Sequence, residues 1–138
     1  MSCWAGLDPG RCKCGLVLVD LNGHTVCEGR IVPPEAVAPI LSAWSAAVDL
    51  QGIVLGNGTT SRRWRDQLPS IAPLHLVDER GSTLQARQRY WELWPPRLWR
   101  RLIPLGLQSP PEALDAVAAL VLVEKHLQQR FSWARTAR

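Results

Sequence analysis

Two short apolar runs separated by a polar turn open the chain. The first, Trp4 to Leu7, ends at the carboxylate of Asp8, and the second covers Leu16 to Val19. Between them, Pro9 cannot donate a ladder hydrogen bond and Gly10 tolerates positive φ, so the first strand is expected to end at Asp8. The pattern predicts a strand, an acid, a tight turn and a second strand, with Asp8 at the mouth of a sheet. An Asp at such a position can also simply cap the turn.

Two strands, a helix and a buried strand are predicted next. Residues 15–21 and 24–32 have strand patterns and are joined by Asn22-Gly23, a dipeptide typical of tight hairpins, so the first three strands form an antiparallel meander. From Pro33 to about Asp49, apolar residues at helical spacing predict a helix that crosses over the sheet. Residues 52–55 are uniformly apolar and precede a Gly-Asn-Gly loop, as expected of a buried parallel strand.

The second half of the chain alternates helices with one more strand. A short helix capped by one of residues 59–61 leads to a strand at residues 74–77, and Ser82 caps a helix from Thr83 to about Trp94. Residues 94–111 are rich in Pro, Arg and Trp and are expected to form a long surface loop. A last helix runs from Pro110 to about Phe131. Its predicted core side consists of Leu114, Val117, Ala118, Val121, Leu122 and Leu127.

This order of elements predicts the fold class. Three antiparallel strands beside two parallel strands, with helices on the faces, is the ribonuclease H-like arrangement of an α/β protein with a five-stranded mixed sheet. The chain of 138 residues suits one domain, which we assign to residues 1–131, with a frayed C-terminal tail at residues 132–138.

Composition indicates a cytoplasmic protein with reduced thiols. No run approaches the roughly 18 apolar residues of a membrane span, and the N-terminus lacks a secretory signal pattern, so no membrane association is expected. The four cysteines lie near the N-terminus as a Cys12-x-Cys14 pair with Cys3 and Cys27. This spacing does not match a zinc site and favours reduced, partly buried thiols.

Charge is distributed unevenly along the chain. Its net value is +4, but residues 1–58 carry three basic and five acidic side chains, whereas residues 59–138 carry thirteen and seven. All but two of the basic residues are Arg, which binds phosphate in a bidentate manner. Nucleic acid is therefore the expected partner, and an ordinary solvated Arg-rich surface is the alternative.

Tryptophans are also frequent in the Arg-rich half, where five of the seven occur. We expect some of them to stack on unpaired bases. Trp91 and Trp94, however, are three residues apart on one predicted helix, which is more typical of a helix core or of a homodimer face.

Three acidic positions fall where a ligand site is expected. Asp8 ends the first strand, Asp78 or Glu79 ends the last strand, and Asp115 lies in the first turns of the last helix. Open α/β sheets bind ligands at the carboxyl ends of their strands, so these acids should converge. Clustered carboxylates without a Lys or His partner nearby in sequence favour a bound cation. Two Mg²⁺ or Mn²⁺ ions there would stabilise the attacking and leaving oxygens of a phosphodiester, which predicts metal-assisted hydrolysis of nucleic acid.

Three segments carry a resemblance to a known family. They are GLDPG with a glycine seven positions after Asp8, VDERGST at the end of the last strand, and LDAVAALVLVEKHL at the start of the last helix. In order and spacing, over nearly the whole chain, they resemble the YqgF/RuvX family of Holliday junction resolvases and pre-16S ribosomal RNA processing nucleases. The resemblance implies that Asp8, Glu79 and Asp115 are catalytic metal ligands, with Asp78 as a fourth candidate. It also implies a substrate that is either a ribosomal RNA precursor or branched DNA.

The chain departs from the family pattern at two places. Cys12 and Lys13 stand where family members usually carry Lys-Arg, and Gly56-Asn57-Gly58 replaces the usual Gly-Leu-Pro. We therefore interpret the chain as a divergent member. The residues expected to contact nucleic acid are Lys13, Asn57, Arg62, Arg63, Arg80, Arg87, Arg97, Arg100 and Arg101.

Two other functions compete with the nuclease. A catalytically weak RNA-binding or ribosome-maturation factor would need the same basic half but no metal. An actin-like or sugar-kinase ATPase would need a second domain, for which the chain is too short. Within the nuclease interpretation, strand alternation points Asp78 and Glu79 to opposite faces. The longer Glu79 is expected to reach the metal, and Asp78 to accept hydrogen bonds from the amides of Ser82 or Thr83.

Overall fold

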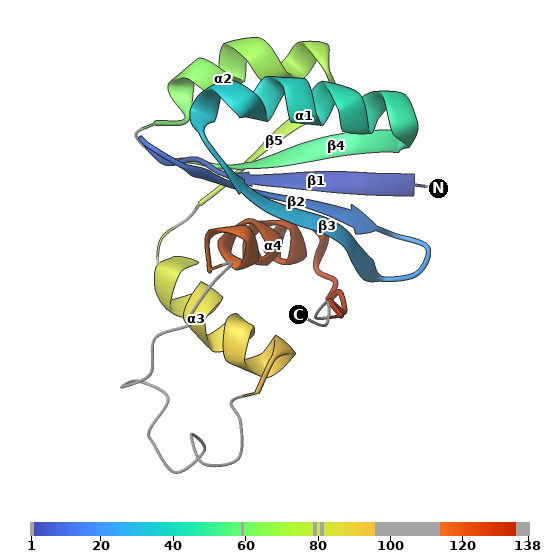
Figure 1. Ribbon diagram of the computed structural model, residues 1–138, viewed down its shortest axis with the longest axis vertical. Helices are drawn as coiled ribbons and strands as arrows, with labels where there is room; N and C mark the ends of the chain where they lie inside the picture. The colour runs from blue at the N-terminus through green and yellow to red at the C-terminus, as the bar shows by residue number, and fades with distance from the viewer. Residues whose placement is uncertain (1, 59, 79, 81, 96–113, 135–138) are drawn as a thin grey trace.

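A five-stranded mixed sheet forms the centre of the protein (Figure 1). The computed structural model describes residues 2–58, 60–78, 80, 82–95 and 114–134. The strand order is β3-β2-β1-β4-β5. The strands are β1 (Ser2–Asp8), β2 (Cys14–Asp20), β3 (Thr25–Val32), β4 (Asp49–Gly56) and β5 (Leu74–Val77). The first three are antiparallel, and β4 and β5 run parallel to β1, which confirms the predicted sheet.

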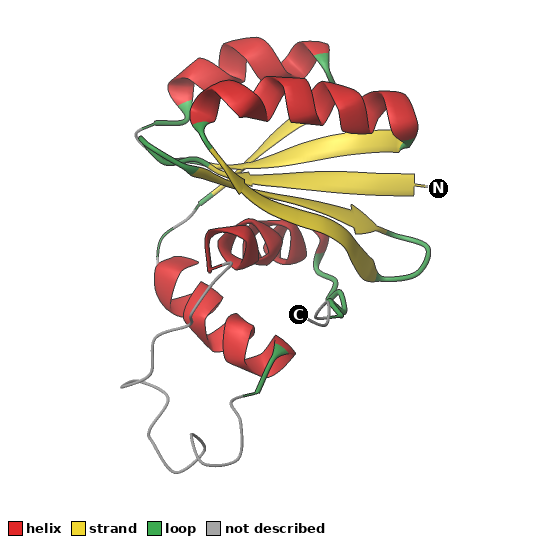
Figure 2. Ribbon diagram, in the orientation of Figure 1, coloured by secondary structure: helices red, strands yellow, loops and turns green. Residues whose placement is uncertain are grey.

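Helices cover both faces of this sheet (Figure 2). They are α1 (Pro34–Ala47), α2 (Arg62–Gln67), the short 3-10 helix η1 (Leu68–Ser70), α3 (Ser82–Leu93) and α4 (Leu114–Leu127). Helices α1 and α2 lie on one face, α4 lies on the other, and α3 forms a further layer outside α4 (Figure 1). The predicted loop at residues 94–111 lies almost entirely outside the described residues.

Strand alternation divides the core into two halves. Cys3, Ala5 and Leu7 of β1 point toward α1, where they are buried with Val37 and Leu41. On the opposite face, a second cluster joins Val17 and Val19 of β2 and Val54 of β4 to α4. Because the central strands are buried on both faces, they are apolar throughout rather than alternating.

Helix α4 is buried on two sides rather than one. Ala119 and Val123 pack against the sheet, while Val117 and Ala118 pack against Ala86, Tyr90 and Trp91 of α3. The predicted single core side was therefore partly wrong. Leu114, Val121 and Leu127 are only partly buried, whereas Ala119 and Val123 are fully buried. The small alanines allow both neighbours to approach closely.

The end of α4 also differs from the prediction. The helix was expected to reach about Phe131 but ends at Leu127, because Gln128 adopts a left-handed backbone conformation with φ of 56°. The chain then turns back toward β3. The amide of Ser132 donates to the carbonyl of His24, and the amide of Val26 donates to the carbonyl of Ser132. Ser132 is therefore held by the sheet and not frayed, contrary to the expected start of the tail.

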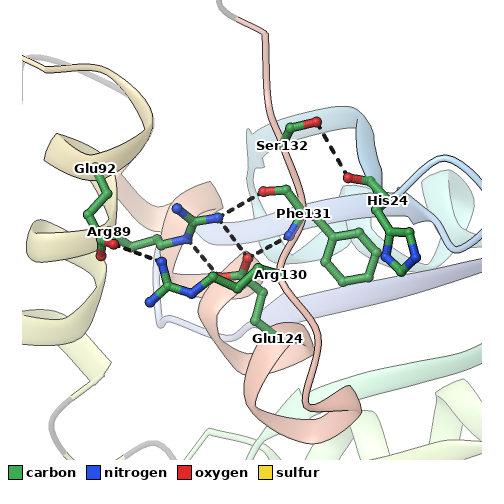
Figure 3. Close-up of polar contacts among 7 residues, drawn as sticks. All are labelled: His24, Arg89, Glu92, Glu124, Arg130, Phe131 and Ser132. Carbon is green, nitrogen blue, oxygen red and sulfur yellow. Dashed lines mark hydrogen bonds and ion pairs between the residues drawn. The ribbon is translucent and has the colours of Figure 1, made fainter.

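A buried ion pair connects α3, α4 and this returning segment (Figure 3). Nε and an Nη atom of Arg89 each donate to Glu124 at 2.9 Å, and Arg89 also donates to the carbonyl of Phe131 at 2.8 Å. Glu124 in turn accepts from the amide of Phe131 at 2.9 Å. The two charged side chains are 11% and 10% exposed. Arg89 is buried despite its charge, because α4 covers its position on α3.

The remaining expectations on side chains have mixed outcomes. All four cysteines are free thiols, with Cys3 and Cys14 buried and Cys12 and Cys27 exposed. Trp64 is 1% exposed and is therefore not one of the tryptophans that could stack on bases, whereas Trp91 is 8% exposed and packs in the core, as its helical spacing had indicated. Within the described ranges, no helix combines the length and apolarity needed to cross a bilayer.

Removing one partner of the buried pair should be far more damaging than removing an exposed one. Glu124→Ala leaves the guanidinium of Arg89 buried without its carboxylate, and we expect a loss of about 3–5 kcal/mol in the free energy of unfolding. Glu92→Ala breaks the exposed pair with Arg130 and should cost about 0–1 kcal/mol. Urea unfolding of both variants measures the difference. Equal losses would contradict a specific role for the buried pair.

Candidate functional site

The carboxyl ends of the three parallel strands lie at one edge of the sheet (Figure 1). Asp8 is the last residue of β1, Asn57 follows β4 and Asp78 follows β5. The amide of Asn57 donates to the carbonyl of Val77 at 2.8 Å, which extends the pairing of β4 and β5 past the strand end. The edge thus presents polar side chains from loops that the sheet holds in position.

Glycines in β1 and β2 allow α4 to bring Asp115 to this edge. Gly15 pairs with Asp8 across the β1–β2 ladder. A Cβ atom at Gly15 would overlap the backbone carbonyl of Asp115, so only glycine permits this approach. One helical turn farther along α4, a Cβ at Gly6 would lie 2.7 Å from the carbonyl of Ala119. Because Asp8 and Gly6 are on the same face of β1, the carboxylates of Asp8 and Asp115 both belong to the α4 side of this edge.

The thiol of Cys14 lies in the electrostatic field of both carboxylates. Burial raises the pKa of Cys14, and the negative charges of Asp8 and Asp115 raise it further, while the guanidinium of Arg63 opposes them. Three charged groups from β1, α4 and α2 therefore act on one sulfur atom. This places Arg63 in the same electrostatic environment as the two carboxylates.

A lysine already neutralises part of this charge. Nζ of Lys13 lies 3.3 Å from Oδ2 of Asp115, with the two side chains 68% and 33% exposed. The sequence pattern had indicated no Lys partner for the acids, because Lys13 and Asp115 are far apart in the chain. The tight turn after β1 brings the ammonium over the start of α4.

Asp78 is placed differently from the other two acids. Its Oδ1 accepts a hydrogen bond from the amide of Arg80 at 3.0 Å, and Oδ2 lies 3.9 Å from the Arg80 guanidinium. Lys125 donates to its backbone carbonyl at 3.1 Å. Asp78 therefore has the expected form of a turn residue, and it accepts a hydrogen bond from the amide of Arg80. Glu79 lies outside the described residues.

Several of the predicted nucleic-acid contacts lie on the turns and the helix around this edge. Arg62 and Arg63 are exposed on α2, Arg80 is exposed after β5, and Lys13 is exposed in the turn after β1. The side-chain oxygen of Asn57 accepts a hydrogen bond from Arg65. Arg87 is partly buried on α3, while Arg97, Arg100 and Arg101 lie outside the described residues.

A groove at this edge contains Arg11, which was not among the residues predicted to contact nucleic acid. It has a volume of about 530 Å³ and lies between the turn after β1 and helix α2. Arg11 lines it together with Arg62 and Arg63. In the sequence, Arg11 could have been noticed as a basic residue three positions after Asp8, at the end of the first strand. Only the fold shows that α2, with Arg62 and Arg63, lies opposite Arg11.

The donor set can be compared with the needs of a divalent cation. Among the residues that the structure describes, no three His, Cys, Asp or Glu side chains form a metal-holding group. Two carboxylates on one side of the sheet edge nevertheless suit the oxygen preference of Mg²⁺, which binds through one or two protein carboxylates plus water and substrate phosphates. The attraction of Lys13 to Asp115 shows that the position favours positive charge.

Comparisons with known proteins bear on the fold. In sequence, the chain matches no protein-family model and no curated protein. Among solved structures, it resembles T. thermophilus RuvC in complex with Holliday junction substrate, with a TM-score of 0.57 and 16% sequence identity. The match covers 91% of this chain and 92% of that chain. It is a likeness of fold, and it confirms the predicted ribonuclease H-like arrangement.

The close approach at Gly15 can be tested by adding one methyl group. Gly15→Ala forces the backbone of Asp115 away from β2, and we expect a loss of about 1–3 kcal/mol in the free energy of unfolding. Gly23→Ala, in the turn between β2 and β3, meets the side chains of Asp20 at 3.3 Å and of Thr25 at 3.5 Å, no backbone atom being among them, and should change stability by about 0.5 kcal/mol or less. Chemical denaturation distinguishes the two. A Gly15→Ala protein as stable as Gly23→Ala would contradict the packing described here.

Proposed function

We propose that the protein is a metal-dependent endonuclease that hydrolyses phosphodiester bonds of structured nucleic acid. The observation that carries the proposal is the placement of Asp8 and Asp115 on one side of the carboxyl edge, on a fold like that of RuvC. Exposed arginines around this edge supply the positive charge that a nucleic-acid substrate requires. The site carries this proposal, since the fold alone serves many activities.

The proposed chemistry assigns distinct tasks to the two kinds of charge. Asp8 and Asp115, with Glu79 as the third ligand, would hold one or two Mg²⁺ or Mn²⁺ ions. When bound, such ions supply positive charge to the attacking and leaving oxygens of the phosphodiester. Lys13 and the arginines of α2 would bind the phosphates on either side and orient the strand for in-line attack. Asp78 would hold the turn that carries Glu79.

Branched DNA is the substrate that we favour, because one solved structure with a similar fold is T. thermophilus RuvC in complex with Holliday junction substrate. A ribosomal RNA precursor is the alternative that membership in the YqgF/RuvX family would imply. In either case we propose a cytoplasmic protein with a single catalytic domain. A homodimer would suit a four-way junction, whose arms are related by symmetry.

A second candidate is a nucleic-acid-binding factor on the same fold that cuts weakly or not at all. The contact between Lys13 and Asp115 favours this candidate, because the ammonium occupies space beside a proposed ligand. The two candidates differ in whether the carboxylates bind metal.

Removing one charge at Asp8 should separate binding from cutting. Asp8→Asn keeps the size of the side chain, so we expect nucleic-acid affinity within about twofold of the parent and a loss of cleavage of at least about a hundredfold, roughly 2.7 kcal/mol in the barrier. Asp49→Asn removes an exposed carboxylate where β4 begins, at the opposite edge of the sheet, and should cut normally. Cleavage of a four-way DNA junction and of a structured RNA, with Mg²⁺ and with Mn²⁺, measures both. If Asp8→Asn cuts as well as the parent, the nuclease proposal is wrong.

The ammonium of Lys13 should compete with metal for Asp115. Lys13→Gln removes this charge, and since an exposed ion pair contributes about 0–1 kcal/mol, Mn²⁺ should bind up to about fivefold more tightly. Arg30→Gln, which removes a positive charge from β3, is the matched control. Titration calorimetry gives the affinities. Equal affinities in the two variants would show that Lys13 does not occupy the metal position.

A further inference from the structure

The groove between the turn after β1 and α2 is held in shape by hydrogen bonds of the loops that form it. Its lining residues are Gly10, Arg11, Thr60, Arg62, Arg63 and Trp64, and its volume is about 530 Å³. The hydroxyl of Thr60 donates to the carbonyl of Pro9 at 3.4 Å, which connects the two walls. The side chain of Ser61 is 1% exposed and donates to the carbonyl of Gly58 at 2.7 Å, so the loop leading into α2 is also held.

Among the residues that the structure describes, no acidic side chain pairs with the arginines of this groove. Elsewhere in the described part of the chain, Arg30, Arg80, Arg89 and Arg130 each pair with a carboxylate. By contrast, the three arginines of the groove form no ion pair with any described acid, and none of the described lining residues carries a carboxylate. Three uncompensated guanidinium groups around one concave surface favour an anionic ligand.

The buried tryptophan limits what that anion can be. Trp64 is 1% exposed, and the Cζ atom of Arg63 lies 4.6 Å from the centroid of its ring. A nucleobase therefore has no aromatic surface on which to stack, and the guanidinium of Arg63 is held against the ring by a cation–π contact. The groups that remain available to a ligand are guanidinium donors, which match phosphate oxygens.

The groove is also close to the two carboxylates. Gly10, which lines it, is two residues after Asp8, and two residues span at most about 7 Å of chain. Arg63 and both carboxylates act on the same Cys14 thiol. Successive phosphates of one duplex DNA strand advance by about 3.4 Å along the axis, so a strand at Asp8 reaches the groove within two or three nucleotides.

We infer that the Arg11–Arg62–Arg63 groove binds the phosphate backbone of the strand that adjoins the bond to be cut, independently of base sequence. This inference rests on the proposed function and defines how its substrate is held. The strand passes from the α4 side of the carboxyl edge, where Asp8 and Asp115 lie, to the α2 side. Recognition by phosphates alone selects the shape of a nucleic acid and not its sequence.

The test compares two double variants that lose the same net charge. Arg11→Gln with Arg62→Gln removes two groove charges and retains Arg63, which packs on Trp64. Arg30→Gln with Arg130→Gln removes two exposed charges outside the groove, each already paired with an acid. Binding of fluorescein-labelled four-way DNA junctions and single strands is measured by anisotropy in EDTA, over a range of salt concentrations, with mixed-sequence and oligothymidine probes.

Loss of two phosphate contacts should flatten the slope of log affinity against log salt by about 1.4–1.8 for the groove variant, to the same extent for every base sequence. The control should keep the slope of the parent. Equal flattening in both variants, or no flattening in the groove variant, overturns the inference. So does a loss confined to one base sequence.

The outcomes for the groove and for the nuclease remain distinguishable. If the parent cuts in an Asp8-dependent manner but the groove variant keeps the parent's salt slope, the groove inference is wrong and the proposed function stands. If the groove variant flattens the salt dependence of binding but Asp8→Asn does not alter cleavage, the groove inference stands and the proposed nuclease function is wrong. A parent that binds neither probe at low salt contradicts both.

Discussion

The close packing of α4 against β1 and β2 is the constraint on which the rest of the structure depends. Gly6 and Gly15 remove the Cβ atoms that would otherwise keep the helix away from the sheet. Since interiors are close-packed, this contact sets the position of every residue along the helix. It brings Asp115 beside the strand pair that contains Asp8, and it turns the other side of α4 toward α3. A property of the core thus decides the geometry of the candidate site.

The second layer keeps α4 in this position. Tyr90 and Trp91 of α3 cover its outer side, and the charged pair of Arg89 and Glu124 connects the two helices to the segment that returns along β3. The pair is costly to bury, and it is tolerated because its donors and acceptors find partners, including the amide and carbonyl of Phe131. Its geometry is specific, so it defines one relative position of the helices where apolar packing alone would allow several.

The electrostatic character of the carboxyl edge follows from loops of opposite charge. Negative charge comes from the strand end at Asp8 and the helix start at Asp115, and positive charge comes from the turn at Arg11 and Lys13 and from α2. A site that combines bound cations with a polyanion needs both signs close together but not fully paired with each other. Here Lys13 contacts Asp115, whereas the groove arginines have no acidic partner among the described residues.

Local sequence patterns predicted the five strands and the main helices in the observed order, because alternation, turn residues and helical spacing act over a few neighbouring positions. The Pro-Gly turn placed Asp8 at a strand end, and the apolar run before Asp78 predicted β5 with the observed bounds. Only the tertiary structure decided that Arg89 is buried, that α4 is covered on two sides and ends at Leu127, and that Lys13 meets Asp115. These contacts join residues far apart in the chain, and they depend on how the helices pack on the sheet. The groove that contains Arg11 has the same origin: its walls are separated by about fifty residues in sequence and become neighbours only when β1 and β4 pair.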